Sequence, residues 1–511
     1  MSAASGEIAP EQAETVALLG SAETHGGERP ERIDTHLSHV FLTAADVYKL
    51  KRAIRLDFVD YSTVAAREAF CHREFAANQT FAGDLYRGVL PIRETAHGLR
   101  LGGAEDDGPA VDWVVHMRRF DDADRLDRRL AAGQVAAQDL AGFADTLADI
   151  YAAAPVDRTQ GGHREIFELI EQVSGDLANA PGCPTDAPRV ADWSRTMRTA
   201  ADRLSGRLDE RRRAGRVRLG HGDLHLRNLC YWKGRLIAFD ALEFDDAMRT
   251  TDVLYDVGFL IMDLVHAGAI AGANTVLSRY LSRSGDWDGL GVLDLFLSLR
   301  AGVRAMAAAL ANDRDTASDY LATAGRLLQP RPAPRLFAIG GRSGSGKSTA
   351  AARVAPRLGK VPGAVLVRSD VIRKRLHGAA PETALPKSAY GPDADRQVHA
   401  ALQTLAAACL ASGWDVMIDA TFLTPQARSD LAAVAVAQGA DFRAVWLQAP
   451  AEVLQERVTG RRNDASDADL SVLERQLARP TPQDWPHVDA NGPADEVASR
   501  VLAGLDPAPA A

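Results

Sequence analysis

Cysteine is scarce in this chain, which has four in 511 residues: Cys71, Cys183, Cys230 and Cys409. They lie far apart in the sequence, and no two of them form a CxxC pair. This spacing excludes a disulfide-stapled scaffold and a cysteine-based zinc module. It favours a protein of a reducing compartment, with buried or inert thiols.

Excess positive charge and long uninterrupted apolar runs are also missing. The formal net charge is −9, which argues against a general nucleic-acid or membrane-surface binder and leaves room only for a local basic groove. The longest apolar stretch, residues 253–276, is interrupted by Asp256, Asp263 and His266. We therefore expect a buried helix rather than a membrane span. The N-terminus has no signal-like pattern, so the sequence predicts a cytoplasmic protein; nothing in it indicates an oligomeric state.

A proline-rich joint divides the chain. Three prolines fall within residues 330–334, where they end the preceding helix and form a stiff connector. At 511 residues the chain exceeds the size of one hydrophobic core. We predict two separately folding domains with flanking segments: a variable leader (1–30), a first domain (31–328), the linker (329–335), a second domain (336–505) and a tail (506–511).

The first domain contains the segment His221-Gly222-Asp223-Leu224-His225-Leu226-Arg227-Asn228. A kinase needs a carboxylate that orients the attacking hydroxyl and accepts its proton, and an amide oxygen a few residues later that holds Mg²⁺. Asp223 and Asn228 have the same spacing as these two groups in the kinase catalytic loop. A second Mg²⁺ carboxylate is expected after the next hairpin, and Asp240 stands there. The pattern predicts a Mg²⁺-dependent phosphoryl-transfer site.

With His-Gly-Asp at 221–223 and Asp-Ala-Leu-Glu at 240–243, the segment resembles the aminoglycoside phosphotransferase family. The resemblance implies an α+β, two-lobed, protein-kinase-like fold. It also implies transfer of the ATP γ-phosphoryl group to hydroxyls of small molecules. In such a protein Asp223 is the catalytic base, Asn228 and Asp240 bind Mg²⁺, and Asp256 supports the catalytic loop.

The resemblance also locates the upstream ATP-binding pair. The strand lysine that grips the phosphates falls on a strand where Lys49 and Lys51 share one face. We prefer Lys49, which two apolar residues precede, and leave Lys51 as the alternative. Its helix partner is expected to be Glu74, with Glu68 second.

Two further kinase elements are expected upstream. Residues 114–117 resemble the linker between lobes that pairs with adenine. Residues 35–42 occupy the place of the hairpin that covers the phosphates, but they contain no glycine. Residues 35–42 therefore depart from the glycine-rich loop that covers the ATP phosphates in kinases.

The second domain begins with a short apolar run that leads into a complete P-loop, G-x-x-x-x-G-K-S. The alanine-rich run after it predicts a helix, whose N-terminus and backbone N–H groups bind phosphate oxygens. Lys347 is expected to reach the β- and γ-phosphates, and Ser348 to hold Mg²⁺. The predicted ATP-binding residues here are Gly341, Arg342, Ser343, Gly344, Ser345, Gly346, Lys347, Ser348 and Thr349.

Three more apolar runs, at residues 365–370, 416–421 and 444–447, predict the other strands of a parallel sheet. Residues 365–370 end in Asp370, with Arg373 three positions later, an arrangement that can orient a hydroxyl and bind an anionic or polar substrate. Residues 416–421 contain Asp419, which is placed like the Mg²⁺-binding acid of P-loop proteins. The pattern is typical of an α/β P-loop NTPase fold.

This domain resembles small P-loop kinases: gluconate-kinase-like enzymes, the kinase domain of 5′-polynucleotide kinases and zeta-toxin-like proteins. The resemblance implies that Asp370 is the base acting on the acceptor and that Arg373 is a catalytic substrate clamp. It also implies that Arg457 and Arg461 belong to a lid over the ATP phosphates. The order of the two domains is similar to that of bacterial proteins in which an aminoglycoside-phosphotransferase-like domain precedes a P-loop kinase-like domain.

Together these patterns predict a bifunctional ATP- and Mg²⁺-dependent phosphotransferase acting on two small hydroxylated substrates, sugars or sugar derivatives. Two alternatives stay open: one domain is catalytic while the other senses nucleotide, or the C-terminal half is a toxin-like or nucleic-acid-end kinase. The complete set at 223, 228 and 240 counts against an inactive first domain, and the acidic net charge counts against nucleic acid. The sequence does not identify either acceptor, because acceptor pockets are built from dispersed residues.

Overall fold

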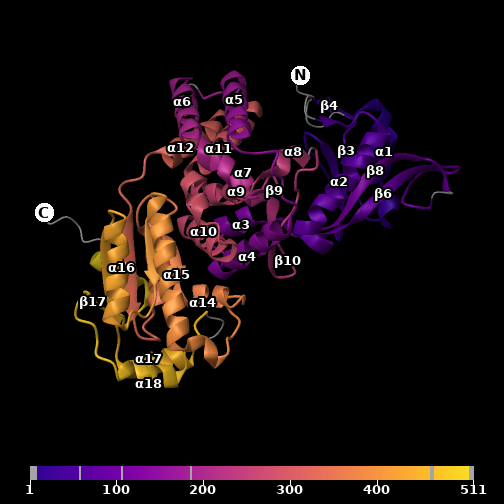
Figure 1. Cartoon of the computed structure of the whole chain (residues 1–511). Helices are drawn as coiled ribbons and strands as arrows, with labels where there is room; N and C mark the ends of the chain where they lie inside the picture. Colours follow the sequence, from indigo (N-terminus) through magenta and orange to yellow (C-terminus); the bar gives the residue numbers. More distant parts are fainter. Residues whose placement is uncertain are drawn as a thin grey trace. The chain divides into compact units, whose positions relative to one another are not determined.

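The computed structural model describes residues 8–56, 59–104, 107–184, 187–244, 246–460 and 465–505. The chain divides into two compact units (Figure 1). The first consists of Met1–Asp139, Ala153–Gly161 and Arg212–Asp256. The second consists of Leu140–Ala152, Gly162–Arg211 and Val257–Ala511.

An antiparallel sheet of six strands organises the first unit, in the order β1-β2-β3-β8-β6-β7. Its strands are β1 (Glu31–Asp34), β2 (Ser38–Leu42), β3 (Asp46–Lys51), β6 (Tyr86–Thr95), β7 (Gly98–Leu101) and β8 (Ala110–Arg118). Helix α2 (Val64–Ala82) packs on β8 and β6, and Thr63 caps its N-terminus by accepting the Ala66 N–H. Figure 1 shows these elements in the indigo part of the chain. In this arrangement, side chains of β3 can reach the buried Glu74 of α2.

Part of the predicted variable leader belongs to this core. Helix α1 (Ala13–Gly20) buries Val16 and Leu19 in a cluster with Phe41, Leu50 and Val114. A few apolar residues on one helical face are enough to anchor such a segment. Residues 1–7 lie outside the described part of the chain.

Two small hairpins complete the first unit. Strand β9 (Val217–Leu219) pairs with β12 (Thr250–Asp252), and β10 (Leu229–Trp232) pairs with β11 (Arg235–Ala238). Lys233 and Gly234 both have positive φ, 49° and 75°, as a tight two-residue hairpin turn requires. The short elements β4 (Arg55–Leu56), β5 (Val59–Asp60), α3 (Leu126–Ala131) and α8 (Asp246–Arg249) lie in the same unit. The predicted hairpin between Asn228 and Asp240 is therefore present.

Helices dominate the first part of the second unit. They are α4 (Ala137–Ala153), α5 (His163–Asn179), α6 (Ala187–Arg203), α7 (Ser205–Arg213), α9 (Val253–His266), α10 (Ile270–Ser284), α11 (Leu290–Leu310) and α12 (Arg314–Leu328). The apolar stretch 253–276 is thus two helices rather than one, because Gly268, at a φ of 76°, ends α9. Among the helices of the described residues, none is long and apolar enough to cross a membrane.

A parallel five-stranded sheet forms the C-terminal part, in the order β14-β15-β13-β16-β17. Its strands are β13 (Arg335–Gly341), β14 (Val365–Arg368), β15 (Val416–Asp419), β16 (Asp441–Gln448) and β17 (His487–Asp489). The helices are α13 (Lys347–Val354), α14 (Ser369–Leu376), α15 (Pro392–Ala411), α16 (Pro425–Ala437), α17 (Ala451–Thr459), α18 (Leu470–Leu477) and α19 (Ala494–Leu505). Helices α13 and α19 pack together in one core with the sheet, and Figure 1 shows α15 beside α16, which it contacts.

The structure confirms both predicted fold classes: an α+β fold in the first part of the chain and an α/β fold with a parallel sheet after it. One detail differs. Strand β14 ends at Arg368, so Asp370 lies in the first turn of α14 rather than at the strand end. The predicted domain limits at residues 30, 328, 335 and 505 remain a proposal.

Candidate active sites

Strand β3 and helix α2 bring a lysine and a glutamate together in the first unit. Lys49 Nζ donates to Glu74 Oε1 at 2.9 Å and to Asp240 Oδ1 at 2.7 Å. The other lysine, Lys51, donates to Glu74 Oε2 at 2.7 Å. Glu74 rather than Glu68 is thus the glutamate of α2 that meets the lysines, and Lys49 is the one that also reaches Asp240.

These contacts shift the acidity of the groups. Burial alone would raise the pKa of Glu74, but the positive charges of Lys49 and Lys51 outweigh it and lower that pKa to about 2. The pKa of Lys49 is raised well above its usual value, because Asp240 and Glu74 outweigh the opposing effect of burial. Glu74 and Lys49 are therefore both charged at neutral pH.

The loop after β9 is held by one buried carboxylate. The backbone N–H groups of His221 and Gly222 donate to the two oxygens of Asp256, at 2.7 and 3.0 Å. A Cβ at Gly220 would lie 2.4 Å from Asp256 Oδ2, and Gly222 has a φ of 84°. The glycines let the backbone approach the carboxylate closely. Asp256 thus occupies the supporting position that the resemblance implies.

Asp223 and Asn228 meet within this loop. Asn228 Nδ2 donates to Asp223 Oδ2 at 2.9 Å and to the Asp223 carbonyl at 3.0 Å. His225 Nε2 lies 3.3 Å from Asp223 Oδ2. The buried His221 ring contacts the Phe239 carbonyl at 3.0 Å, which links the loop to the end of β11. Asp240 follows directly after that residue.

Asp240 has an unusual backbone. Its φ is 60°, in the left-handed region that Asp tolerates better than most residues. Its N–H donates to the Tyr86 hydroxyl at 3.2 Å, and the Ala241 N–H donates to Asn78 Oδ1 at 3.0 Å. Tyr86 and Asn78 were missed by the sequence analysis. No motif marks them, because they come from β6 and α2 and meet the loop only in the fold.

The expected adenine linker is corrected by the structure. Residues 114–117 lie inside β8, which pairs with β3 on one side and β6 on the other. Their backbone groups are engaged in the sheet, so they cannot pair with a base. The expected phosphate-covering segment does contain a hairpin turn, between β1 and β2.

The P-loop of the second unit connects β13 to α13. Gly341, Gly344 and Gly346 have φ values of 151°, 82° and 82°. A Cβ at Gly344 would lie 2.5 Å from the Leu454 carbonyl, and one at Gly341 would lie 2.6 Å from Ser345 Oγ. Side chains are excluded at both positions. The loop is therefore shaped by its glycines into a cradle of backbone N–H groups.

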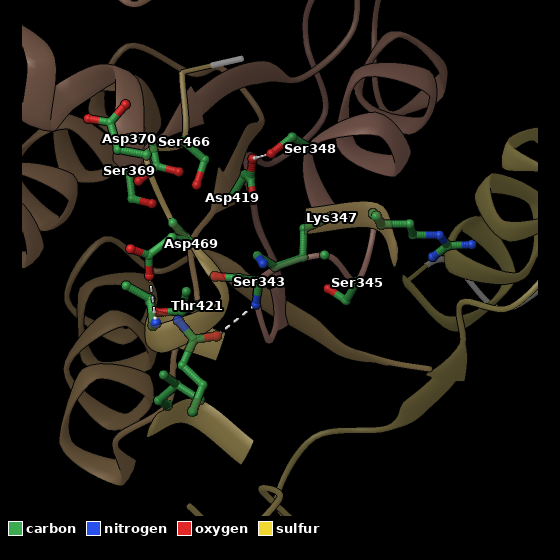
Figure 2. A pocket seen from close by; sticks show the side chains of 18 of the residues that line it. Ser343, Ser345, Lys347, Ser348, Ser369, Asp370, Asp419, Thr421, Ser466 and Asp469 are labelled. Atoms are coloured by element: carbon green, nitrogen blue, oxygen red, sulfur yellow. Dashed lines mark hydrogen bonds between the residues drawn. The ribbon is translucent and has the colours of Figure 1, made fainter. Parts of the chain in front are cut away.

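Ser348, at the start of α13, faces Asp419 at the end of β15 (Figure 2). Ser348 Oγ donates to Asp419 Oδ2 at 2.5 Å, and Arg368 Nε lies 3.4 Å from the same oxygen. Lys347 Nζ donates to the Arg342 carbonyl at 2.9 Å. The predicted pair of Mg²⁺ ligands, Ser348 and Asp419, is thus brought together.

The side chain of Arg342 is anchored outside the P-loop. Its guanidinium donates to the carbonyls of Gln476 and Arg479, at 3.1 and 2.8 Å. Gln476 Oε1 in turn accepts the Ser343 N–H at 2.7 Å. Arg342 therefore ties the P-loop to α18 through its side chain. Gln476 lay outside the sequence prediction, because a glutamine on a helix carries no motif.

Asp370 lies beside this cradle and is perturbed. Burial raises its pKa, with a further contribution from the negative charge of Asp419, while Arg368, a hydrogen bond from Ser466 and Lys347 act in the opposite direction. Figure 2 shows Asp370, Ser369 and Ser466 close together. A carboxylate with a raised pKa next to a phosphate site is the usual setting of a general base.

The predicted arginines differ in their surroundings. Arg373 is 9% exposed; it donates to the Ala389 carbonyl at 2.9 Å and to Asp395 Oδ1 at 2.7 Å, while its Nε has no partner among the described residues. Arg457 Nη1 donates to the Ala490 carbonyl at 3.0 Å. Arg461 lies outside the described residues.

One cavity of about 960 Å³ joins these groups. It is lined by the P-loop from Ser343 to Thr349, by Asp370, Arg373 and Asp419, and by Arg457. Its size suits a nucleotide together with a small second ligand.

The residues of the P-loop fit ATP and Mg²⁺. In the P-loop, Ser345 Oγ is buried without a hydrogen-bond partner among the described residues, and Ser348 and Asp419 offer the oxygen ligands that Mg²⁺ prefers. In the first unit, the carboxylate of Asp240 and the amide of Asn228 belong to the same class of ligand. Each group of oxygen ligands has a lysine nearby: Lys347 precedes Ser348 in the P-loop, and Lys49 contacts Asp240 in the first unit.

Comparisons with known proteins agree with the P-loop fold. Residues 336–482 match a family model described as an AAA domain. Uncharacterized proteins of Mycobacterium tuberculosis and Mycobacterium bovis are 29% identical over 482 residues, which is 90% of this chain and 92% of theirs.

Two solved structures are similar to parts of this chain. A sugar kinase from Janibacter sp. HTCC2649 is 26% identical, and the match covers 34% of this chain and 96% of that one, with a TM-score of 0.27. A choline/ethanolamine kinase family protein from Mesorhizobium loti is 16% identical; this match covers 62% of this chain and 95% of that one, with a TM-score of 0.38. In its architecture the chain has an α+β first part with an antiparallel sheet, followed by a P-loop fold with a parallel sheet.

Proposed function

We propose that the chain is a bifunctional phosphotransferase, which transfers the γ-phosphoryl group of ATP to hydroxyls of small molecules at two separate sites. One observation carries the proposal: each unit contains a carboxylate base candidate, oxygen ligands for Mg²⁺ and a lysine for the phosphates. A nucleotide sensor needs the last two groups only.

At the first site, Asp223 orients the acceptor hydroxyl and accepts its proton. Its 2.9 Å contact with Asn228 fixes the carboxylate. Asn228 and Asp240 hold Mg²⁺, which neutralises phosphate charge when bound. Lys49, positioned by Glu74, grips the phosphates.

At the second site, Asp370 acts as the base toward the acceptor hydroxyl. Lys347 and the P-loop backbone hold the β- and γ-phosphates, and Ser348 and Asp419 hold Mg²⁺. Arg373, with its unpartnered Nε, contacts the acceptor. Arg457, which lines the same cavity, contacts the nucleotide phosphates.

The lining of the second cavity favours a polar, hydroxylated acceptor such as a sugar or sugar derivative. Around Asp370 it offers hydroxyl and carboxylate groups, among them Ser369, Ser466 and Asp467. Such groups match the donors and acceptors of a polyol. We place the protein in the cytoplasm, where ATP is available and where buried thiols such as Cys71 and Cys409 stay reduced.

The test is phosphate transfer by the full chain from labelled ATP to a panel of sugars, aminoglycosides and nucleic-acid 5′ ends. Asp223→Asn should abolish one transfer activity and Asp370→Asn the other, each by about 100-fold or more, the usual scale for a general base. Both variants should still bind Mg·ATP, because shape and phosphate contacts are kept.

The variants also separate the rival functions. If Asp370→Asn transfers phosphate normally while Lys347→Ala loses ATP hydrolysis, the second site is a nucleotide switch rather than a kinase. If transfer goes to nucleic-acid ends alone, the small-molecule assignment fails.

A further inference from the structure

Two ionisable side chains near the first site have no role in the proposed reaction. Lys51 on β3 and Glu243, three residues after Asp240, form an ion pair of 2.7 Å. Lys51 is fully buried and Glu243 is 8% exposed. A buried ion pair is often no more stabilising than apolar residues of similar volume. Its place between β3 and the metal-binding loop therefore points to a second purpose.

The pair belongs to a larger network. Lys51 Nζ also donates to Glu74 Oε2 at 2.7 Å, while Lys49 Nζ donates to Glu74 Oε1 at 2.9 Å. The two oxygens of Glu74 are thus held by two different lysines. The Tyr61 hydroxyl donates to Glu243 Oε1 at 3.0 Å, and the Tyr61 ring lies 5.1 Å from Lys51 Nζ.

The two lysines differ in access to solvent. The Lys49 side chain is 17% exposed, and Asp240, which it contacts, is 44% exposed. The side chain of Lys51 is completely enclosed. Lys49 can therefore reach a nucleotide, whereas Lys51 is committed to Glu74 and Glu243.

We propose that Lys51 and Glu243 are positioning residues, which keep Glu74 and the 240–243 loop in place when Lys49 and Asp240 turn to Mg·ATP. The inference rests on the proposed function of the first site. It assigns the two lysines of β3 to different tasks: Lys49 contacts the phosphates, and Lys51 keeps Glu74 and the 240–243 loop in position.

The physical reason lies in an exchange of contacts. Lys49 bonds Asp240 Oδ1 at 2.7 Å, and this contact competes for both groups once Asp240 would hold Mg²⁺ and Lys49 would hold phosphate. With a single lysine, the buried Glu74 would depend on the residue that moves. Lys51 supplies a hydrogen-bond donor that stays with Glu74. This matters because a buried carboxylate oxygen without a donor costs folding free energy. Glu243 ties the metal-binding loop to β3 through the same ammonium group.

The experiment uses the full chain in a Lys347→Ala background, so that nucleotide binding reports the first site. The variants are Lys51→Met, Lys51→Met with Glu243→Leu, and Lys49→Met. Each is measured for its Tm and for the affinity of a fluorescent ATP analogue, mant-ATP, with and without Mg²⁺. The ratio of the affinity with Mg²⁺ to the affinity without it, called here the Mg²⁺-dependent gain, measures how well the 240–243 loop supports metal binding.

We expect Lys51→Met to lower the Tm, because two buried carboxylates lose a cation. The double variant removes one of those carboxylates and should recover most of the Tm. Its Mg²⁺-dependent gain should stay about tenfold or more below that of the background, the usual cost of losing a group that orients a metal ligand. Lys49→Met should lower the Tm less than Lys51→Met does, because Lys51 still holds Glu74 and the second partner of Lys49, Asp240, is partly exposed, and it should lose nucleotide affinity.

A double variant that recovers both the Tm and the Mg²⁺-dependent gain shows a purely structural pair and overturns the inference. A background protein that binds no Mg·mant-ATP overturns the proposed function of the first site instead. Should the double variant fail to fold, Glu243→Gln decides in the same assay. It keeps the shape and removes the charge that holds Lys51, so an unchanged gain would overturn the inference.

Discussion

Single residues in this protein owe their chemistry to burial and to one or two charged neighbours. Glu74 keeps a low pKa despite complete burial, because two lysines surround it. Asp370 shows the opposite balance, since burial and Asp419 outweigh the cations beside it. A buried carboxyl group thus has a lowered pKa in one site and a raised pKa in the other.

The raised pKa of Asp370 predicts an acid limit for the second reaction. A general base must be ionised, and Asp370 takes up a proton at a higher pH than an ordinary carboxylate does. Transfer at the second site should therefore fall as pH drops through this raised pKa, by about tenfold per unit below it. The measurement is the pH profile of kcat in an Asp223→Asn background. A rate that stays flat down to the ordinary carboxylate range would contradict the role of Asp370.

The cysteines give a second residue-scale prediction. Burial raises the pKa of Cys71 and Cys230 to about 12 and also raises that of Cys409. Thiolates are the reactive form, so an aromatic disulfide reagent at pH 8 should label the native chain at the partly exposed Cys183 alone. Cys183→Ser should abolish labelling without denaturant, and labelling that persists would show that the burial is wrong.

Among the elements, the P-loop depends on glycine for its backbone conformation. Gly344 has a φ of 82°, and an added Cβ would meet the Leu454 carbonyl of α17 at 2.5 Å. Gly413 has nearly the same φ, 79°, with nothing within 4 Å of an added Cβ. The two positions separate backbone strain from steric contact.

Gly344→Ala should therefore cost more than Gly413→Ala. Both introduce a left-handed alanine, at about 1–2 kcal/mol, but only Gly344→Ala also pushes the P-loop away from α17. We expect Gly344→Ala to lower ATP affinity at the second site by tenfold or more, roughly 1.4 kcal/mol. Gly413→Ala should lower the Tm slightly and leave ATP affinity unchanged. Equal affinities in the two variants, measured by calorimetry in an Asp240→Asn background, would contradict this explanation.

At the scale of the whole molecule, the predicted linker is not a bare connector. Within the second unit, Arg331 donates to both oxygens of Asp294 on α11, at 2.9 and 2.8 Å. Asn274 on α10 is buried and donates to the carbonyls of Pro362 and Ala364, and Ser278 Oγ accepts the Leu366 N–H of the edge strand β14. Helix α10 therefore satisfies backbone groups of the P-loop fold.

Asn274→Ala tests how far the P-loop fold depends on α10. Two buried carbonyls would lose their donor, which costs about 1–3 kcal/mol of unfolding free energy. Thr275→Ala is the matched control, because the Thr275 hydroxyl bonds only the Ala271 carbonyl of its own helix. Chemical denaturation of the full chain measures both. If Asn274→Ala is as stable as Thr275→Ala, the P-loop fold stands on its own, as the sequence-based prediction of separately folding halves requires.

The sequence by itself determined the local chemistry of this protein. The interval between Asp223 and Asn228, the hairpin before Asp240 and the glycines of the P-loop depend on neighbours in the chain, so spacing was enough to predict them. Only the tertiary structure decided which distant groups meet: Glu74 rather than Glu68, and Tyr86 and Asn78 beneath Asp240. It likewise revealed that residues 114–117 are engaged in a sheet and that Gln476 supports the P-loop. Those contacts join segments far apart in sequence, where no periodicity or spacing records which side chains will touch.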